Sequence, residues 1–173
     1  MGAATIAKHV QEEMRRRLSY DKDTGAVIWV VGRKAGQQIF NKSCQGYLRL
    51  KIAGKNYYLH RVCWFLHHGE WPTEWIDHIN GNKSDNRLEN LRVVSSSQNS
   101  ANRPLAVNNT TGYKGVVYRK AFNKYLVRVG ANPRTIVGYF ESLEEAARAY
   151  NEAAKELYGE YARLNNIQGT QEQ

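Results

Sequence analysis

Residues 76–86, with the sequence IDHINGNKSDN, place a carboxylate and an imidazole side by side directly before a stretch rich in turn-forming residues. Neighbouring side chains of a strand point to opposite faces, so we expect Asp77 and His78 to serve different tasks. Asn90 follows in the stretch LENLR, and Asn99 lies on the next expected helix. Asp77 and Asn99 could offer two oxygen ligands to a hard divalent cation, while His78 could take a proton from an attacking water.

Two interpretations of this pattern are open. Asn, Asp and Gly are the usual residues of tight turns, so the segment alone also fits an ordinary polar turn. A path of strand, loop, strand and first helical turn can bring Asn99 back beside Asp77, and Asn90 could hold the loop by hydrogen bonds to its backbone. The second interpretation is such a site, in which a metal would stabilise charge on a phosphate and on its leaving oxygen.

The elements expected around this pattern follow from hydrophobic periodicity. Leu48, Leu50 and Ile52 alternate with polar residues in a strand at 46–52, which is typical of a half-buried strand. The other predicted elements of this part are, in chain order, a helix carrying Ile6, Val10, Met14 and Leu18, a strand at 26–30, a turn at 53–54 with a returning strand at 55–60, a buried helix at 61–69 stopped by Gly69, a strand at 91–95, and a short helix that begins at Ser95 with a capping box to Gln98 and ends before Pro104.

A second module is expected beyond a polar, turn-rich linker at 103–112 (RPLAVNNTTG). Its predicted elements are three strands at 114–119, 124–130 and 135–140, then a helix capped by Ser142 and Glu145, stopped by Gly159, with an apolar face of Leu143, Ala146, Ala147, Tyr150, Ala154 and Leu157. The predicted fold class is α+β, with domains at 1–102 and 113–166 and a tail at 167–173.

The distribution of charge indicates a polyanionic partner. The chain carries a formal net charge of +9 and a pI near 9.6, which favours nucleic acid. Between Gly112 and Phe140 there is no acidic residue, and the chain turns acidic from Glu141. Arg128 alternates with its valine neighbours, so we expect it to point away from the helix-packed face of its sheet. A basic, merely solvated sheet face is the alternative.

Other classes of protein are excluded by absences in the sequence. No apolar run approaches the roughly 20 residues that cross a bilayer, and the N-terminus lacks the apolar core of a secretory signal. Cys44 and Cys63 stand alone, so neither a disulfide framework nor a structural zinc cluster is encoded. We expect a cytoplasmic protein, in a bacterial host cell if a phage or intron encodes it.

The stretch DHINGNKSDNRLENLR resembles the HNH endonuclease family, whose site is built on a ββα-metal fold, and the resemblance covers roughly residues 18–102. It implies that Asp77 is the first metal ligand, His78 the general base, Asn90 the asparagine that shapes the loop, and Asn99 the second metal ligand. Many members have histidine at the last position. Asparagine there, and the stretch YLHRVCW before the site, are similar to the phage and intron homing branch, where a hairpin and a helix precede the metal motif.

Two residues of YLHRVCW are open to more than one interpretation. For His60 a structural role is favoured over a catalytic one. Arg61 could neutralise phosphate near the site, or it could pack against Trp64 or form a structural ion pair; we include it among the candidate DNA contacts.

The second module resembles the AP2 DNA-binding domain, through YKGVVYR, KYLVRV and RTIVGYF on three strands and EEAARAYNEAA on the helix. In that family the sheet lies in the major groove. The resemblance implies that the DNA contacts are Arg119, Lys124, Tyr125, Arg128, Arg134 and Tyr139. Tyr125 and Tyr139 stand where the plant regulators usually have tryptophan, which puts a transferred base preference in doubt.

Together these features predict a site-specific DNA endonuclease of the homing type that acts on double-stranded DNA. We expect one divalent metal ion, Mg²⁺ with Mn²⁺ as the alternative. We expect no obligate protein partner, and a monomer that nicks one strand, because no dimer helix is evident. The alternative is a non-catalytic, sequence-specific DNA-binding regulator with a decayed nuclease module. Retention of Asp77, His78, Asn90 and Asn99 favours the enzyme.

Overall fold

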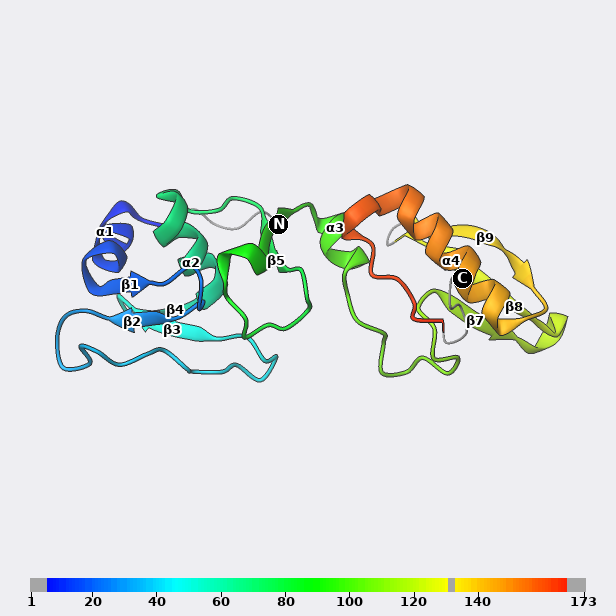
Figure 1. Cartoon of the computed structure of the whole chain (residues 1–173), viewed down its shortest axis with the longest axis horizontal. Coiled ribbons are helices and arrows are strands. Elements are labelled where there is room, and N and C mark those ends of the chain that lie inside the picture. Colours follow the sequence, from blue (N-terminus) through cyan, green and yellow to red (C-terminus); the bar gives the residue numbers. More distant parts are fainter. Residues whose placement is uncertain (1–5, 131–132, 168–173) are drawn as a thin grey trace. The chain divides into compact units, whose positions relative to one another are not determined.

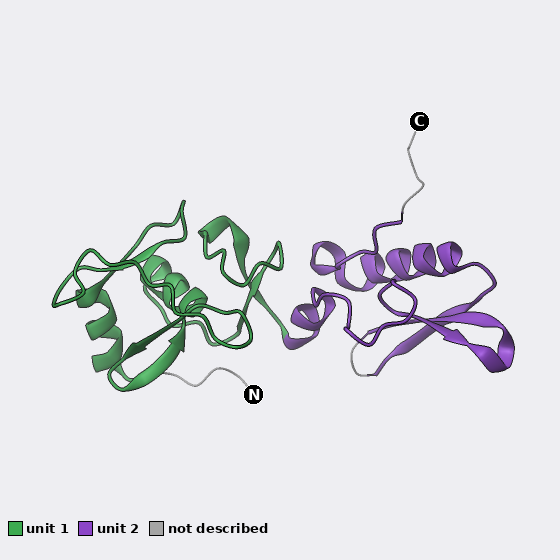
Figure 2. Cartoon of the chain, turned by 90° about the horizontal axis from the view of Figure 1, so that it is seen from below, with its two compact units in different colours: residues 1–95 green, residues 96–173 purple. Residues whose placement is uncertain are grey.

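The computed structural model describes residues 6–130 and 133–167 and divides the chain into two compact units, residues 1–95 and 96–173 (Figures 1 and 2). The division falls before the predicted boundary at residue 102, so the short helix α3 (Ser96–Ala101) belongs to unit 2. The predicted domain limits stay a prediction.

In its described residues, unit 1 contains three antiparallel strand pairs and two α-helices. Met14, Val62 and Phe65 are completely buried in one core to which both helices contribute. The paired strands are β1–β2, β3–β4 and β5–β6. The elements are α1 (Lys8–Arg17), β1 (Leu18–Tyr20), β2 (Val27–Trp29), β3 (Arg49–Ile52), β4 (Lys55–Tyr58), α2 (Leu59–His68), β5 (Trp75–His78), the 3₁₀ turn η1 (Leu88–Asn90) and β6 (Leu91–Val94).

Most predicted elements of unit 1 are present, with two corrections. Leu48, Leu50 and Ile52 are buried, as their alternation predicted, and α2 ends with Gly69 in the left-handed conformation at φ 80°. Ile6 and Leu18, however, lie outside the first helix: Ile6 precedes its start at Lys8, and Leu18 lies in β1 opposite Trp29. The returning strand also ends at Tyr58, so that His60 belongs to the first turn of α2.

The pairing of β5 with β6 sets the two faces on which the candidate chemistry lies. Asp77 pairs with Arg92 and His78 with Leu91 across this antiparallel ladder. Ile76 and His78 are buried on one face, and Asp77 projects from the other because side chains alternate along a strand.

Unit 2 is a three-stranded antiparallel sheet in the order β7–β8–β9, with helix α4 along one face (Figure 1). The strands fall within their predicted ranges. Helix α4 begins after Ser142, whose Oγ accepts a hydrogen bond from the Glu145 backbone at 3.4 Å. Beyond α3 the elements are β7 (Val116–Arg119), the 3₁₀ turn η2 (Lys120–Phe122), β8 (Lys124–Val129), β9 (Thr135–Phe140), α4 (Leu143–Tyr158) and the 3₁₀ turn η3 (Gly159–Tyr161).

The core between sheet and helix corrects one residue of the predicted apolar face. Val116 and Val127 from the sheet pack against Tyr150 and Ala154 of α4. Leu157, predicted on that face, is 53% exposed. Tyr158 packs against the core instead, because it lies four residues after Ala154 and therefore above it on the helix.

In the part of the chain that the structure describes, no helix has both the length and the apolar character needed to cross a membrane.

Gly115 provides a test of the packing in unit 2. Its φ is +76°, and a Cβ there would lie 2.1 Å from Tyr150 Cδ2 and 2.7 Å from the Arg128 carbonyl oxygen. Gly112 has a similar φ of +77° but nothing within 4 Å of its Cβ position. We expect Gly112→Ala to destabilise the protein by ~1 kcal/mol through backbone strain, and Gly115→Ala by about 1–3 kcal/mol more through the clash.

The measurement is urea unfolding followed by circular dichroism and by tryptophan fluorescence. All four tryptophans, Trp29, Trp64, Trp71 and Trp75, belong to unit 1, so fluorescence reports that unit. The Gly115→Ala shift should appear in circular dichroism and leave the fluorescence transition in place. Equal shifts for the two alanine variants would contradict the packing described here.

Candidate active site and nucleic-acid interface

His78 ends strand β5 and is buried, with 3% of its surface exposed. Its Nε2 lies 3.1 Å from Oδ1 of Asn86, which is itself 1% exposed. An amide oxygen only accepts, so Nε2 carries the proton and the lone pair of a neutral ring is on Nδ1. The bond therefore fixes both the ring orientation and the tautomer that a general base needs.

Asn90 closes the loop that carries Asn86. Its Oδ1 accepts a hydrogen bond from the Asn80 backbone at 2.9 Å, and its Nδ2 donates to the Asp85 carbonyl at 2.8 Å. The Ile79 backbone also donates to the Asn90 carbonyl at 2.9 Å. The loop contacts expected of Asn90 are thus present, and its part in catalysis remains a prediction.

A charged cluster supports the same loop at its surface. Asp85 accepts two hydrogen bonds of 2.9 Å from the Arg87 guanidinium and one of 2.8 Å from the Asn80 side chain. The Arg87 contact is the main reason why the pKa of Asp85 is lowered to about 2. The carboxylate is therefore ionised at neutral pH and belongs to the loop's own hydrogen bonds.

The N-terminal hairpin β1–β2 packs against the backbone of this loop. The Tyr20 hydroxyl donates to the Asn86 carbonyl at 2.8 Å, and the Leu88 backbone donates to the Lys22 carbonyl at 2.9 Å. Gly25, at φ +73°, lies so close that a Cβ would meet the Arg87 nitrogen at 2.6 Å. Only glycine fits there, so the hairpin turn and the loop hold one another in place.

Aromatic rings surround the buried face of His78. Its centroid is 5.1 Å from that of His60 and 6.0 Å from that of Tyr47. Burial lowers the pKa of His78, while the Asn86 bond and the charge of Asp77 oppose that shift. Burial, together with His78 and Arg61, lowers the pKa of His60 to about 3. Both histidines are therefore neutral near pH 7.

Asp77, the predicted first metal ligand, is paired with an arginine. Arg92 Nη2 lies 3.3 Å from Asp77 Oδ2, and both side chains are largely buried. The described residues contain no cluster of three or more His, Cys, Asp or Glu side chains that could hold a metal. A metal would therefore rest on the Asp77 carboxylate, an amide oxygen, water and substrate phosphate, which is an oxygen donor set that suits Mg²⁺.

Asn99, the predicted second ligand, lies on α3 in unit 2, whereas Asp77, His78 and Asn90 belong to unit 1. The pairing of Asn99 with Asp77 stays a prediction.

Arg61 is engaged in contacts within unit 1. Its guanidinium donates to the carbonyls of Glu74, at 2.8 Å, and Pro72, and it lies over the Trp71 ring. These contacts hold the segment that leads into β5. We therefore do not retain Arg61 among the DNA contacts that we propose below.

Unit 2 presents some of the predicted DNA contacts on the sheet face opposite α4. Arg119 is exposed, and Tyr139 is 46% exposed with its ring against Phe122. Lys124 shares this face by alternation and reaches Glu141 at 3.3 Å. This ion pair is solvent-exposed and therefore weak.

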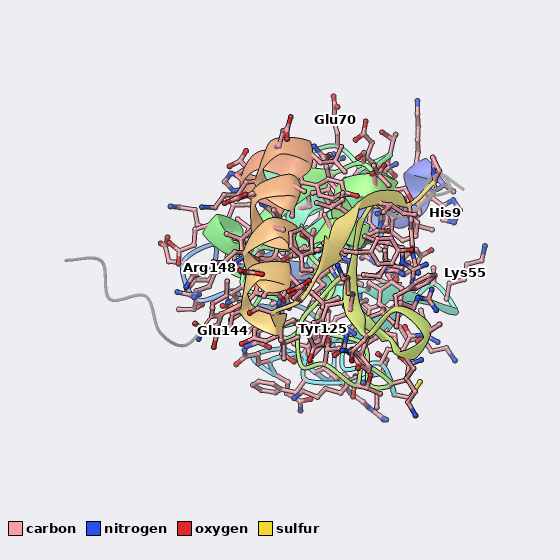
Figure 3. All side chains as sticks on the ribbon, turned by 90° about the vertical axis from the view of Figure 1, so that its right-hand side faces the viewer. His9, Lys55, Glu70, Tyr125, Glu144 and Arg148 are labelled. Atoms are coloured by element: carbon pink, nitrogen blue, oxygen red, sulfur yellow. The ribbon has the colours of Figure 1, made fainter. Side chains whose placement is uncertain are left out.

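The other predicted contacts of unit 2 are Tyr125, Arg128 and Arg134. Tyr125 shares the helix-side face with Val127 and packs against the core, so we do not retain it as a DNA contact; Figure 3 shows it on the sheet and Arg148 on α4. Arg128 is half-buried between two buried valines. With Arg134 it lines a cavity that is described below.

Sequence reasoning missed Asn86, Tyr20 and Gly25. Asn86 stands inside the DHINGNKSDNRLENLR stretch, and its position there was a usable signal. The contact of Tyr20 with the loop joins residues 66 positions apart, and no local pattern reveals it.

Residues 57–101 match a family model described as HNH endonuclease. An uncharacterized HNH endonuclease of Acanthamoeba polyphaga mimivirus is 36% identical over 112 residues, which cover 63% of this chain and 57% of that protein. Protein 3.8 of Escherichia phage T7 is 30% identical over 106 residues, covering 61% of this chain and 88% of that protein. No solved structure matches significantly.

The match thus spans little more than half the length of the mimivirus protein, but most of the phage protein. Asp77, His78, Asn86 and Asn90 all fall within the matched residues 57–101. By these matches residues 57–101 form a domain of the HNH endonuclease family.

Proposed function

We propose that this protein is a site-specific DNA endonuclease of the homing type, in which His78 is the general base. The observation that carries the proposal is the hydrogen bond from His78 Nε2 to Asn86 Oδ1 at 3.1 Å. A buried ring that is neutral, fixed in orientation and protonated on Nε2 carries its lone pair on Nδ1, the nitrogen that accepts a proton in general-base catalysis. A histidine that served only to fill a turn would not require a buried amide to hold it.

The hydrolysis follows from the placement of groups on β5. His78 takes a proton at Nδ1 from the water that attacks the scissile phosphate, and Asn86 holds the ring through the transfer. Asp77 and Asn99 would hold one divalent ion, Mg²⁺ or Mn²⁺. When bound, that ion stabilises the charge that develops on the phosphate and on the leaving oxygen. Asn90 acts indirectly, because it closes the loop on which Asn86 lies.

DNA recognition is assigned to the outer sheet face of unit 2. Arg119 and Tyr139 are exposed there, and Lys124 shares the face. No acidic residue interrupts the sequence between Gly112 and Phe140. The proposed cleavage site around His78 occurs once per chain. We therefore propose a monomer that nicks one strand of double-stranded DNA.

One observation favours a second function, that of a DNA-binding regulator without nuclease activity. Arg92 already neutralises the Asp77 carboxylate at 3.3 Å, as would suit a module that has lost its metal. The two functions share every DNA contact and differ only in DNA cleavage. A cleavage assay therefore decides between them.

Replacing the general base should abolish most cleavage and preserve binding. We expect His78→Ala to lower the cleavage rate ~10²–10⁴-fold, the usual value of general-base help. His67→Ala, which removes an exposed histidine from the end of α2, is the matched control and should cut like the wild type. The substrate is supercoiled DNA carrying the recognition site, with Mg²⁺, Mn²⁺ or EDTA, and binding is measured by gel shift.

Open circles would identify a nicking enzyme, and linear product a double-strand cutter. Full activity of His78→Ala would remove the base assignment. Tight binding by the wild type without cleavage in either metal would establish the regulator.

Asn86 should affect turnover through its oxygen. Asn86→Leu removes the acceptor for His78 Nε2, and we expect kcat to fall roughly 10- to 100-fold with little change in KM. Asn86→Asp keeps an oxygen at the same place and should restore most of that loss. Thermal unfolding of both variants is the control for folding. Equal loss in the two variants, or wild-type turnover in Asn86→Leu, would refute a tautomer-fixing role.

The DNA contacts should appear in the salt dependence of binding. Each phosphate neutralised contributes about −0.9 to the slope of log affinity against log salt. We expect Arg119→Ala to make this slope shallower by roughly that amount, as measured by fluorescence anisotropy. Arg148→Ala removes the same charge from an exposed position of α4 and should leave the slope unchanged. Identical slopes in the two variants would exclude the outer sheet face as the binding surface.

A further inference from the structure

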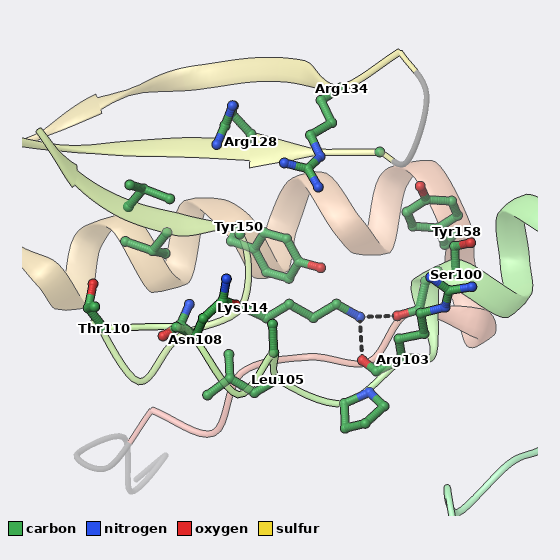
Figure 4. A pocket seen from close by; sticks show the side chains of 18 residues that line it. Ser100, Arg103, Leu105, Asn108, Thr110, Lys114, Arg128, Arg134, Tyr150 and Tyr158 are labelled. Carbon is green, nitrogen blue, oxygen red and sulfur yellow. Dashed lines mark hydrogen bonds between the residues drawn. The ribbon is translucent and has the colours of Figure 1, made fainter. Parts of the chain in front are cut away.

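Unit 2 contains a cavity of about 580 Å³ that the proposed cleavage site does not use. It is bounded by the segment 103–110, the start of β7, the end of β8 with Gly130, Arg134 ahead of β9, and α4 (Figure 4). All its lining residues lie between positions 100 and 158. Its volume falls within the range of ordinary small-molecule sites, about 300–1,000 Å³.

The charge of the lining is of one sign. Arg103, Lys114, Arg128 and Arg134 line the cavity, and no Asp or Glu does. Among the residues described, none of the three arginines forms an ion pair. In Figure 4 the Arg134 side chain descends from the sheet toward Tyr150 and Lys114. Positive groups that face a shared space without an acidic partner favour an anionic ligand.

Lys114 is held in place by the backbone that forms the wall. Its Nζ donates to the carbonyls of Ala101 and, at 2.8 Å, Arg103. Burial, together with Arg163 and Arg103, lowers the pKa of Lys114 to about 8. Its charge is therefore retained near pH 7 in a position where it lacks full hydration. The positive charges of Arg163 and Arg103 repel the charge of Lys114. A bound anion would offset this repulsion.

Hydrogen-bond donors supplement the charges. Tyr150 and Tyr158 line the cavity from α4, and burial raises the pKa of Tyr150 to about 12, so that its hydroxyl stays protonated. Thr110 and Ser100 add two hydroxyl groups. Guanidinium groups with nearby hydroxyls match the several oxygens of a phosphate, which arginine binds in a forked geometry.

We propose that this cavity binds a phosphate group, carried either by a mononucleotide or by a nucleic-acid strand. The binding of a mononucleotide is independent of nuclease activity, because no residue of 76–90 lines the cavity. The binding of a strand phosphate rests on the DNA binding proposed above and would add Arg128 and Arg134, which line the cavity, to its contacts.

The test uses the full chain carrying His78→Ala, so that DNA stays intact. Deoxyadenosine monophosphate, inorganic phosphate and deoxyadenosine are titrated by calorimetry. We expect one monophosphate per chain, with deoxyadenosine at least tenfold weaker. Arg134→Gln should weaken the monophosphate roughly 10- to 100-fold, as for a lost charged hydrogen bond. Arg148→Gln, which removes the same charge from α4, should have no effect.

A parallel titration with duplex DNA distinguishes the two sources of phosphate. If the monophosphate does not bind, but Arg103→Gln and Arg134→Gln weaken DNA binding more than Arg148→Gln does, the ligand is a strand phosphate. If neither ligand distinguishes these two variants from Arg148→Gln, the cavity is not a phosphate site. Absence of cleavage by the wild-type chain would affect none of these results, so a failure of the proposed nuclease is recognised separately.

Discussion

The hydrogen bond between His78 and Asn86 is the constraint that the rest of unit 1 must satisfy. It joins a strand end to a loop residue eight positions later, and both side chains are buried. With Oδ1 engaged, the Asn86 Nδ2 is buried without a partner among the described residues, and such a group costs about 1–3 kcal/mol. The loop must offset that cost. The Asn90 side chain and the Tyr20 hydroxyl supply the compensating bonds.

The two faces of β5 set different electrostatic conditions. On one face His78 is neutral among rings, and its burial outweighs the charges of Asp77 and Asp85. On the other face Asp77 is balanced by Arg92. Alternation along the strand keeps these conditions apart although the residues are neighbours in sequence. A carboxylate ion pair and a neutral imidazole can therefore coexist within one dipeptide.

Much of the local structure was predictable from the sequence, because local chemistry determines it. The alternation in β3, the left-handed Gly69 that ends α2 and the Ser142 cap of α4 all depend on residues a few positions apart. The loop contacts of Asn90 were also anticipated, since Asn80 and Asp85 are close in the chain. The resemblance alone did not distinguish the two faces of the second sheet at Tyr125. Tyr125 has the same parity as Val127, so alternation alone would have placed it toward the helix.

The support of the site could not be predicted in this way. Tyr20 and Gly25 contact the loop across more than sixty positions, and only the folded chain brings them together. Arg61 is a second example. From the sequence, a cation beside the motif suggested a phosphate contact. In the folded chain its guanidinium donates hydrogen bonds to the carbonyls of Pro72 and Glu74.

Burial also determines which interactions of the chain added salt can weaken. The hydrogen bond that orients His78 is buried in unit 1, where ionic screening is slight, whereas Arg119 is exposed on unit 2, where added salt screens it. In the function proposed above, DNA affinity and the geometry of proton transfer therefore depend on different units and respond to different conditions. A chain of this kind can alter its affinity through surface charge while the residues around His78 keep their arrangement.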